Sequence, residues 1–236
     1  MNDSPVLITG GGQRAGLHLA RRFMGEGRPV VVTYRREQPV IRELSAAGAV
    51  CIQADFSDSA AILQFIDALR ERVGSLRAII HNASTWTADA EGEEAAERFL
   101  ALFHVHMQAP YLINKGCRDL LLAAGETADI IHLTDDAVRK GSANHAAYVA
   151  TKAGLDNLTR SFAAMYAPQI KVNTIAPALL AFNDGDDEDY RERVIRKSVL
   201  GIVPGFDVIY QTVAYLMDNP YITAATIPLN GGRSVK

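Results

Sequence analysis

The sequence predicts an α/β fold with one doubly wound, parallel, seven-stranded sheet. Seven short segments rich in Val and Ile recur along the 236 residues, and most of them are hydrophobic throughout. Strands of that kind are buried on both faces, as in a parallel sheet that helices cover on either side. Segments with a 3.6-residue hydrophobic period separate the strands, which is typical of alternating strand–helix folds. Because the alternation continues through nearly the whole chain, we expect a single domain over residues 1–236.

The individual elements follow from the hydrophobic runs and from the residues that bound them. The predicted strands cover residues 5–9, 29–34, 49–55, 77–82, 128–134, 170–177 and 224–229. Amphipathic periodicity predicts helices over 17–27, 60–74 and 153–167. Gly25 and Gly27 suit the end of the first helix, and Pro168 ends the third. Sheets of this type bind ligands outside the carboxyl ends of their strands, so we expect the functional residues directly after the strands.

Composition and charge disfavour several classes of function. The net charge is −3 and 22% of the residues are charged, so bulk electrostatics do not favour a nucleic-acid or membrane partner. No hydrophobic run approaches membrane-spanning length, and the first residues lack the basic region of a signal peptide. Cys51 and Cys117 are far apart and are expected to stay unpaired, as in a reducing cytoplasm. The acidic segment 184–197 lacks the oxygen-ligand spacing of a calcium loop, so no metal site is expected.

The first predicted strand leads into a glycine-rich turn, 9-TGGGQRAG-16, which a predicted helix follows. Glycines let the backbone approach a pyrophosphate, and the N-terminus of the helix provides N–H donors and a favourable dipole. The position between a strand and a helix predicts a Rossmann-type dinucleotide site that includes Gly10, Arg14 and Ala15. The alternative is a tight turn with no ligand.

The residues after the second strand indicate which dinucleotide binds. NAD-binding proteins usually have an acid there, which binds the ribose 2′-hydroxyl. This chain has Tyr34, Arg35 and Arg36, and two guanidinium groups suit a 2′-phosphate. NADPH is therefore expected rather than NADH, although a solvated basic turn would have the same composition. Glu37 is a competing acid that lies later than expected, and Asp55 is either an adenine contact or part of a helix cap.

Tyr148 and Lys152 are four residues apart, so they share one face of a helix. A tyrosine has an unperturbed pKa of about 10, which is too high for efficient proton exchange at neutral pH. A lysine ammonium beside it would favour the phenolate and lower that pKa. The same lysine is suited to hold the ribose of a nicotinamide. The pair predicts proton transfer in a reductase.

Five segments together resemble the short-chain dehydrogenase/reductase family. They are 9-TGGGQRAG-16, 82-NAS-84, 148-YVATK-152, 173-NTIAP-177 and 230-NGG-232, in the family's order and spacing along essentially the whole chain. The catalytic set of the family is Asn, Ser, Tyr and Lys, with the serine thirteen residues before the tyrosine. Here Asp135 occupies the serine position and His106 the asparagine position, and Arg14 replaces a third glycine of the turn.

Pteridine reductases, a branch of that family, resemble this chain at two of these departures. They have TGxxxRxG in the turn and use Asp, Tyr and Lys for catalysis. An aromatic residue two positions after their Asn-Ala-Ser motif stacks on the pterin, and Trp86 has that position in 82-NASTW-86. The resemblance implies reduction of a dihydropterin by NADPH. The expected reaction converts 7,8-dihydromonapterin to the tetrahydro form, with weaker action on dihydrofolate.

The resemblance also implies residue roles and an assembly. The expected catalytic residues are Asp135, Tyr148 and Lys152, and the expected substrate-binding residues are Arg14, Ser84, Trp86, Asp135 and Tyr148. The expected cofactor-binding residues are Gly10, Arg14, Ala15, Tyr34, Arg35, Arg36, Asp55, Asn82, Ala83, Ser84, Tyr148, Lys152 and Pro177. In this family, helices such as 99–122 and 148–165 pair across subunits, so a homotetramer is expected.

The chemistry of a pterin accounts for the carboxylate. A pterin presents a 2-amino group and ring N–H groups, and the two oxygens of a carboxylate accept more hydrogen bonds than one hydroxyl. Reduction of a dihydropterin acts on a C=N bond, so the nitrogen must gain a proton as hydride reaches the carbon. We expect Asp135 and Tyr148 to share that proton transfer.

Simpler interpretations of the same residues are local. Asp135 or Asp136 would cap backbone N–H groups, Trp86 would be part of a cleft wall, and His106 would be a structural helix residue. At the level of function, one alternative is a carbonyl reductase for a 3-oxoacyl thioester or a small ketone. Another is a regulator that binds NADPH without turnover. Such regulators often lack the Tyr/Lys pair, which this chain keeps.

Overall fold

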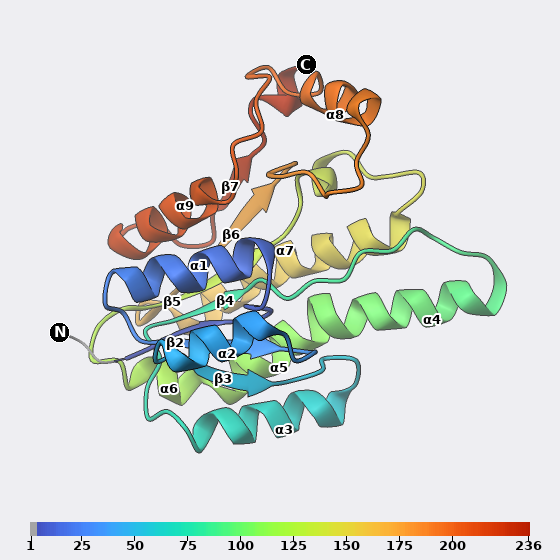
Figure 1. Cartoon of the computed structure of the whole chain (residues 1–236). Coiled ribbons are helices and arrows are strands. Elements are labelled where there is room, and N and C mark those ends of the chain that lie inside the picture. The colour runs from blue at the N-terminus through green and yellow to red at the C-terminus, as the bar shows by residue number, and fades with distance from the viewer. Residues whose placement is uncertain (1–3) are drawn as a thin grey trace.

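The computed structural model describes residues 4–236, so the first three residues of the predicted domain lie outside the described part. Seven parallel strands form one sheet in the order β3-β2-β1-β4-β5-β6-β7, which confirms the predicted fold class (Figure 1). Each strand lies within a predicted segment. The strands are β1 (Val6–Ile8), β2 (Val30–Tyr34), β3 (Val50–Gln53), β4 (Ala78–His81), β5 (Ala128–Leu133), β6 (Ile170–Pro177) and β7 (Thr226–Leu229).

Helices connect the strands and cover both faces of the sheet. They are α1 (Arg14–Gly25), α2 (Pro39–Ala46), α3 (Ser59–Arg70), α4 (Gly92–Phe103), α5 (Ala109–Gly116), α6 (Arg118–Leu122), α7 (Ala146–Tyr166), α8 (Glu188–Ile195) and α9 (Asp207–Asp218). Short 3₁₀ segments cover Asp136–Arg139 and Arg233–Val235. The three predicted helices correspond to α1, α3 and α7.

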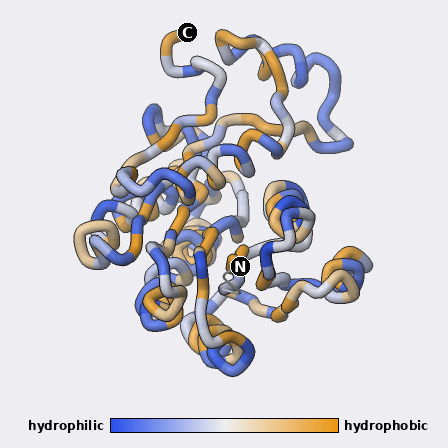
Figure 2. The backbone as a smooth tube through the Cα atoms, turned by 90° about the vertical axis from the view of Figure 1, so that its left-hand side faces the viewer, coloured by the Kyte–Doolittle hydropathy of each residue, from blue (hydrophilic) through white to orange (hydrophobic). Residues whose placement is uncertain are grey.

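The hydrophobic core has two layers, one on each face of the sheet, because successive strand side chains point to opposite faces. On β1, Leu7 packs in the layer formed with α3, α5, α6 and α7. Its neighbours Val6 and Ile8 pack in the opposite layer, which includes α1 and α9. Figure 2 shows hydrophobic and hydrophilic stretches alternating around the coils of the helices. Burial on both faces explains why the inner strands are mostly hydrophobic, whereas the edge strands β3 and β7 are more exposed.

The expected helix over residues 99–122 is present as three α-helices in succession, with two irregular points between them. A π-helical turn over His104–Gln108 separates α4 from α5, and Cys117 separates α5 from α6. A π-helical turn contains more residues than an α-helical one and is frequent at functional sites. Here it carries His106, whose side chain is 1% exposed.

A buried group of charges holds α9 against the other end of the sheet. Asp129 on β5 accepts a hydrogen bond from Arg77 Nη1 at 2.6 Å, and Lys171 Nζ lies 3.2 Å from the other carboxylate oxygen. Lys171 also donates to the carbonyl oxygens of Leu216 and Asn219 at the end of α9, at 2.6 and 2.7 Å. These contacts fix the helix whose first turn, at the opposite end, lines the cleft described next.

Candidate active site

A cleft of about 1200 Å³ lies along the carboxyl ends of the strands. Segments that follow β1, β2, β3, β4, β5 and β6 line it, together with the first turns of α7 and α9. Every residue that the sequence analysis assigned to catalysis, cofactor or substrate is part of this lining. The parallel sheet therefore brings the predicted residues together, as the general rule for doubly wound folds requires.

The glycine turn after β1 is pinned against the segment after β4. Asn82 Nδ2 donates to the carbonyl oxygens of Thr9 and Gly10, both at 2.9 Å. Gly10 has a φ of +70°, in the left-handed region that favours glycine. A Cβ on Gly16 would lie 2.3 Å from the Gly10 carbonyl oxygen and 2.5 Å from Asn82 Nδ2, so no side chain fits there. The turn keeps its backbone open toward the cleft.

The far end of the cleft is basic. Arg35 and Arg36 follow β2, are exposed, and form no ion pair with a carboxylate among residues 4–236. Glu37, the competing acid, instead pairs with Arg42 at 3.3 Å and is not part of the cleft lining. The two free guanidinium groups suit a phosphate, while the nearby carboxylate is already engaged with a cation. Asp55 caps the backbone N–H of Ser57 at 3.1 Å, which leaves its second oxygen for another contact.

At the other end of the cleft, Tyr148 donates a hydrogen bond from its hydroxyl to Asp135 Oδ2 across 3.1 Å. The other carboxylate oxygen, Oδ1, accepts from the backbone N–H of Ala137 at 2.7 Å and caps the short 3₁₀ segment. The interpretation of Asp135 as a local cap is therefore confirmed for Oδ1, and Oδ2 remains directed at the Tyr148 hydroxyl, where the expected catalytic role would need it. Asp136 has a different partner. It accepts a hydrogen bond from Asn230 Nδ2 at 2.7 Å, which holds the 230-NGG-232 segment next to the segment that follows β5.

The expectation that Lys152 lowers the pKa of Tyr148 is wrong in this structure. Burial raises the pKa of Tyr148, and the charge of Asp135 and the hydrogen bond to it raise this pKa further. Lys152 does not counter this effect, because its Nζ donates to the Leu133 carbonyl oxygen at 2.9 Å and lies 5.9 Å from the centre of the Tyr148 ring. Tyr148 therefore holds its proton as a phenol. Burial lowers the pKa of Lys152 itself to about 8.

Arg14 connects the glycine turn to the segment after β6. Its guanidinium donates to Asn183 Oδ1 at 2.7 Å and to the Ala181 carbonyl oxygen at 3.1 Å. The same group lies 5.4 Å from the centre of the Phe206 ring. Arg14 thus spans the space between the turn and the segment that leads to α8. This position is consistent with its assignment to both the cofactor and the substrate.

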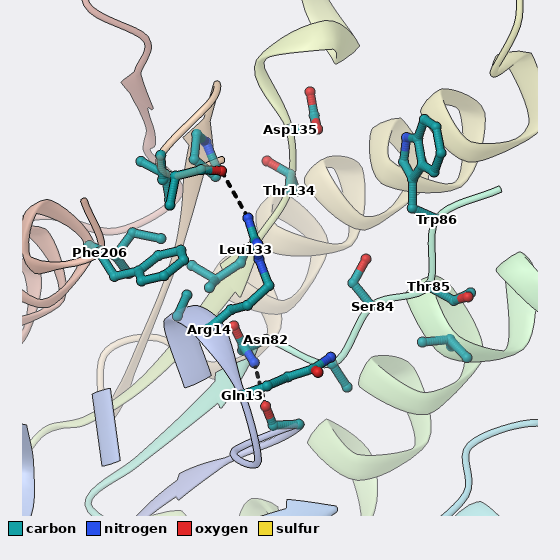
Figure 3. Close-up of a pocket in the computed structure, with 18 of the residues that line it drawn as sticks. Gln13, Arg14, Asn82, Ser84, Thr85, Trp86, Leu133, Thr134, Asp135 and Phe206 are labelled. Atoms are coloured by element: carbon teal, nitrogen blue, oxygen red, sulfur yellow. Dashed lines mark hydrogen bonds between the residues drawn. The ribbon is translucent and has the colours of Figure 1, made fainter. Parts of the chain in front are cut away.

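Trp86 stands at the rim of the cleft, with 67% of its surface exposed. His145, at the start of α7, packs on its ring with the two ring centres 4.4 Å apart and the planes inclined by 31°. In Figure 3, Ser84, Trp86 and Asp135 lie around one opening, and Arg14 approaches from the glycine turn. The exposed indole is therefore backed by a second aromatic ring and presents a flat apolar surface, rather than being an ordinary packed wall residue.

His106 does not line the cleft but bonds to residues that do. Its Nε2 lies 2.9 Å from Ser84 Oγ and 3.3 Å from the backbone nitrogen of Thr85. On the other side of the ring, Nδ1 lies 2.9 Å from Thr151 Oγ1. Burial lowers the pKa of His106 to about 2, and the charge of Lys152 contributes. The imidazole is therefore neutral at physiological pH.

Sequence reasoning missed one residue that positions the catalytic helix. The Asp89 carboxylate accepts from the backbone N–H groups of Ala146 and Ala147, at 2.6 and 3.1 Å. It thereby caps α7 two residues before Tyr148, although it is 57 residues away from Ala146. No local motif reveals this contact, because a cap that comes from a distant loop has no fixed sequence spacing.

Residues 4–236 contain no group of three or more His, Cys, Asp or Glu side chains arranged to hold a metal ion. Across that same part of the chain, no helix combines the length and the hydrophobicity needed to cross a membrane. Cys51 and Cys117 are both free thiols, as expected.

The chain is similar to known reductases along its whole length. A family model described as enoyl-(acyl carrier protein) reductase matches residues 15–234. The dihydromonapterin reductase of Enterobacter sp. (strain 638) is 47% identical over 230 residues, which cover 97% of this chain and 96% of that protein. The dihydromonapterin reductase of Escherichia coli (strain K12) is 45% identical over 233 residues, which cover 98% and 97%.

A solved structure has the same architecture. FolM alternative dihydrofolate reductase 1 from Brucella canis, complexed with NADP, aligns with a TM-score of 0.89 at 26% identity. The alignment covers 100% of this chain and 95% of that one.

Proposed function

The chain belongs to the short-chain dehydrogenase/reductase family, and from that premise we propose that it reduces 7,8-dihydromonapterin to the tetrahydro form with NADPH, and dihydrofolate more weakly. The relatives named dihydromonapterin reductase support this substrate, as does the solved alternative dihydrofolate reductase. The observation in this chain that carries the proposal is the contact between Tyr148 and Asp135. A carboxylate occupies the family's serine position and is bonded to the phenol that supplies protons.

The residues of the cleft suit NADPH. At the start of α1, the glycine turn leaves no space for a side chain at Gly16. Such a tight turn before a helix N-terminus suits a pyrophosphate. At the far end, Arg35 and Arg36 have no carboxylate partner among the described residues, so both are available to a 2′-phosphate. We assign the buried ammonium of Lys152 to the nicotinamide ribose. When bound, NADPH supplies the hydride for the reaction.

The proton comes from the pair formed by Tyr148 and Asp135. Reduction of a C=N bond adds hydride to carbon and one proton to nitrogen. Tyr148 keeps its proton because burial and Asp135 raise its pKa. The phenol therefore gives its proton to the substrate nitrogen and becomes a phenolate. One proton taken from water, relayed through the half-buried Asp135 carboxylate, then restores the phenol.

The pterin ring itself requires a flat surface and polar edges. Trp86 offers the surface, and its contact with His145 keeps the ring in one orientation. Ser84 and Asp135 offer acceptors for the amino and ring N–H groups, and Arg14 offers donors. These assignments are specific to a heterocycle with several N–H groups, which a simple ketone does not have.

One observation favours a second candidate, a reductase for an acyl thioester. A smaller apolar pocket of about 260 Å³ adjoins the cleft and is lined by residues such as Leu179, Ile195, Leu200 and Val208. An acyl chain would fit this surface, and the matching family model describes a reductase of acyl thioesters. The carboxylate at position 135 argues against this candidate, because a ketone oxygen needs a donor there.

The test is oxidation of NADPH by the purified protein with three substrates, namely 7,8-dihydromonapterin, dihydrofolate and an acetoacetyl thioester. We expect turnover with both pterin substrates, a higher kcat/KM for dihydromonapterin, and no turnover with the thioester. Turnover with the thioester alone would overturn the proposal in favour of the second candidate. NADPH binding with no turnover of any substrate would favour a regulator.

We further propose that residues 1–236 act as one NADPH-binding domain in a cytoplasmic homotetramer. Exposed hydrophobic side chains on α4 to α7 support the assembly, and they include Phe99, Leu100, Tyr111 and Met165. Light scattering should give four times the 25.6 kDa of one chain. Fractionation of cells that express the protein should recover the activity with the cytoplasm.

A further inference from the structure

His106 is a buried histidine beside the active site that the mechanism above does not use. It lies on the π-helical turn between α4 and α5, and its side chain is 1% exposed. Its Nε2 contacts Ser84 Oγ at 2.9 Å and the Thr85 backbone nitrogen at 3.3 Å. Its Nδ1 contacts Thr151 Oγ1 at 2.9 Å. Both ring nitrogens are therefore engaged. Ser84 and Thr85 connect the imidazole to the cleft, and its ring also packs on the Tyr148 ring, with the ring centres 5.4 Å apart.

The two ends of this chain of contacts fix the direction of every hydrogen bond. The Thr85 backbone N–H can only donate, so Nε2 of His106 must be an acceptor. At the other end, the Thr151 hydroxyl donates to the Tyr148 carbonyl oxygen at 2.8 Å. Since the only proton of the Thr151 hydroxyl is engaged in that hydrogen bond, Thr151 Oγ1 must accept the hydrogen bond from Nδ1–H of His106. His106 is thus the neutral imidazole with its proton on Nδ1.

This tautomer determines what Ser84 offers to a substrate. Because Nε2 is an acceptor and lies 2.9 Å from Ser84 Oγ, the Ser84 hydroxyl donates a hydrogen bond to the imidazole. Only the lone pairs of Ser84 Oγ then face the cleft, so Ser84 acts there as an acceptor. Asp135 is also an acceptor when ionised. Two acceptors therefore flank the reacting centre, and Tyr148 is the proton donor between them.

We propose that His106 is a positioning residue that turns Ser84 into a hydrogen-bond acceptor, and thereby selects substrates with N–H groups over substrates with a carbonyl oxygen. The proposal rests on the proposed function, because a dihydropterin is a substrate of the first kind. Its amino and ring N–H groups match the lone pairs of Ser84 and Asp135. A ketone or thioester oxygen would find a donor only in Tyr148 and would otherwise face the lone pairs of Ser84 and Asp135, which costs binding energy.

The first test is independent of any substrate. Nitrogen NMR of the protein with ¹⁵N-labelled histidine distinguishes a protonated from an unprotonated ring nitrogen. The His106 signals are identified by their loss in a His106→Gln variant. We expect Nδ1 to carry the proton and Nε2 to be unprotonated between pH 6 and 8. A proton on Nε2 would overturn the proposal, even if the protein reduces dihydropterins.

The second test compares two variants of His106, one with a polar atom near the position of Nε2 and one with a polar atom near the position of Nδ1. The amide oxygen of His106→Gln reaches the position of Nε2 and can still accept from Ser84, whereas His106→Asn reaches only the position of Nδ1. We expect the first variant to keep its kcat/KM for a dihydropterin within about threefold. We expect the second to lose roughly tenfold, mainly through a higher KM, which is the scale of one hydrogen bond. Its preference for dihydropterin over acetoacetyl thioester should fall by a similar factor.

The same two variants in a Ser84→Ala background separate positioning from a structural effect. If His106 acts through Ser84, the Gln and Asn substitutions should differ by less than twofold once the hydroxyl is gone. Thermal unfolding and the dissociation constant of NADPH should be alike in the two variants. An unchanged tenfold difference between the variants in the Ser84→Ala background would overturn the proposal. A protein that reduces no dihydropterin at all would instead refute the proposed function, and the NMR result would still decide the tautomer.

Discussion

The Tyr148 hydroxyl donates a hydrogen bond to Asp135 Oδ2 at 3.1 Å, and the other oxygen of the same carboxylate caps the 3₁₀ segment that follows Asp135. One carboxylate therefore serves the chemistry and the local fold together. The cap orients the side chain, because a hydrogen bond to the Ala137 N–H at 2.7 Å leaves Oδ2 directed at the phenol. An aspartate at this position does what a serine in its place could not, because a serine hydroxyl has only one oxygen.

Replacing Asp135 with serine should therefore change the substrate class. The variant lacks the second oxygen and the negative charge, so kcat/KM for 7,8-dihydromonapterin should fall roughly 100-fold, the scale of a lost acid–base group. Turnover of an acetoacetyl thioester should rise, since the hydroxyl can donate to a ketone oxygen. Rates of NADPH oxidation with both substrates test this. Asp136→Asn is the matched control, because Asp136 bonds to Asn230 and not to Tyr148. A variant at position 135 as active on dihydropterins as the wild type would contradict the assignment.

Removal of Arg35 and Arg36 should weaken NADPH binding and leave NADH binding nearly unchanged. The double alanine variant loses two charged donors to a 2′-phosphate, and each such hydrogen bond contributes about 1.5–3 kcal/mol. The KM for NADPH should rise at least about tenfold. Arg42→Ala is the control, because Arg42 already pairs with Glu37 at 3.3 Å. An equal rise of the KM for NADPH and for NADH would show that the two arginines do not bind the 2′-phosphate.

Gly16→Ala and Gly25→Ala should have opposite effects, although both glycines lie on α1. A Cβ at Gly16 would meet the Gly10 carbonyl oxygen at 2.3 Å, so the turn must shift and NADPH binding should be lost. A Cβ at Gly25 meets nothing within 4 Å, and alanine is favoured over glycine in helices by about 0.5–1 kcal/mol. Thermal unfolding and titration with NADPH measure both effects. Unimpaired NADPH binding by the Gly16→Ala protein would mean that the turn is not the phosphate site.

Activity should decline as the pH rises through about 8. Burial lowers the pKa of Lys152 to about 8, so its ammonium is protonated below that pH and neutral above it. The protonated form binds the ribose in our assignment, hence kcat/KM should fall on the alkaline side. In a Lys152→Arg variant this decline should disappear, because a guanidinium does not titrate in that range, although the absolute rate should be lower. A flat profile up to pH 10 in the wild type would contradict the assignment.

Stability should fall as the pH drops below 6.5. Burial lowers the pKa of His81 to about 4 and that of His132 well below its usual value. In the unfolded chain both groups take up protons near pH 6.5, so the unfolded state binds more protons than the native state below that pH. The free energy of unfolding should decrease by about 1.4 kcal/mol per pH unit for each histidine. Urea denaturation at pH 7, 6 and 5 measures the slope.

A His132→Gln variant is the comparison for that slope. It removes one titrating group from the buried network, in which His132 bonds to Asn114 and Thr159 at 3.2 and 2.8 Å. The variant should be less stable than the wild type at pH 7 and should show a smaller dependence on pH. If the free energy of unfolding changed equally with pH in both proteins, groups other than His132 would cause the loss of stability at acidic pH.

The sequence by itself determined the sheet and the contents of the cleft. The inner strands are buried on both faces and mostly hydrophobic, and the more exposed edge strands β3 and β7 are also rich in hydrophobic residues, so all seven could be recognised. Parallel strands bring their carboxyl ends to one edge. Residues that follow those strands, such as Asp135 and Arg35, therefore had to meet in one cleft. The motifs then indicated a dinucleotide and a proton-transferring pair, because their spacing is local.

Only the tertiary structure decided how those residues act on one another. The pKa of Tyr148 rises rather than falls, since burial and the Asp135 carboxylate outweigh a lysine that bonds to a strand carbonyl. The tautomer of His106 depends on a backbone N–H from one loop and a hydroxyl from α7, and the cap on α7 comes from Asp89 in a distant segment. Hydrogen-bond direction, burial and charge separation depend on distances in space, and the distance along the chain does not determine them.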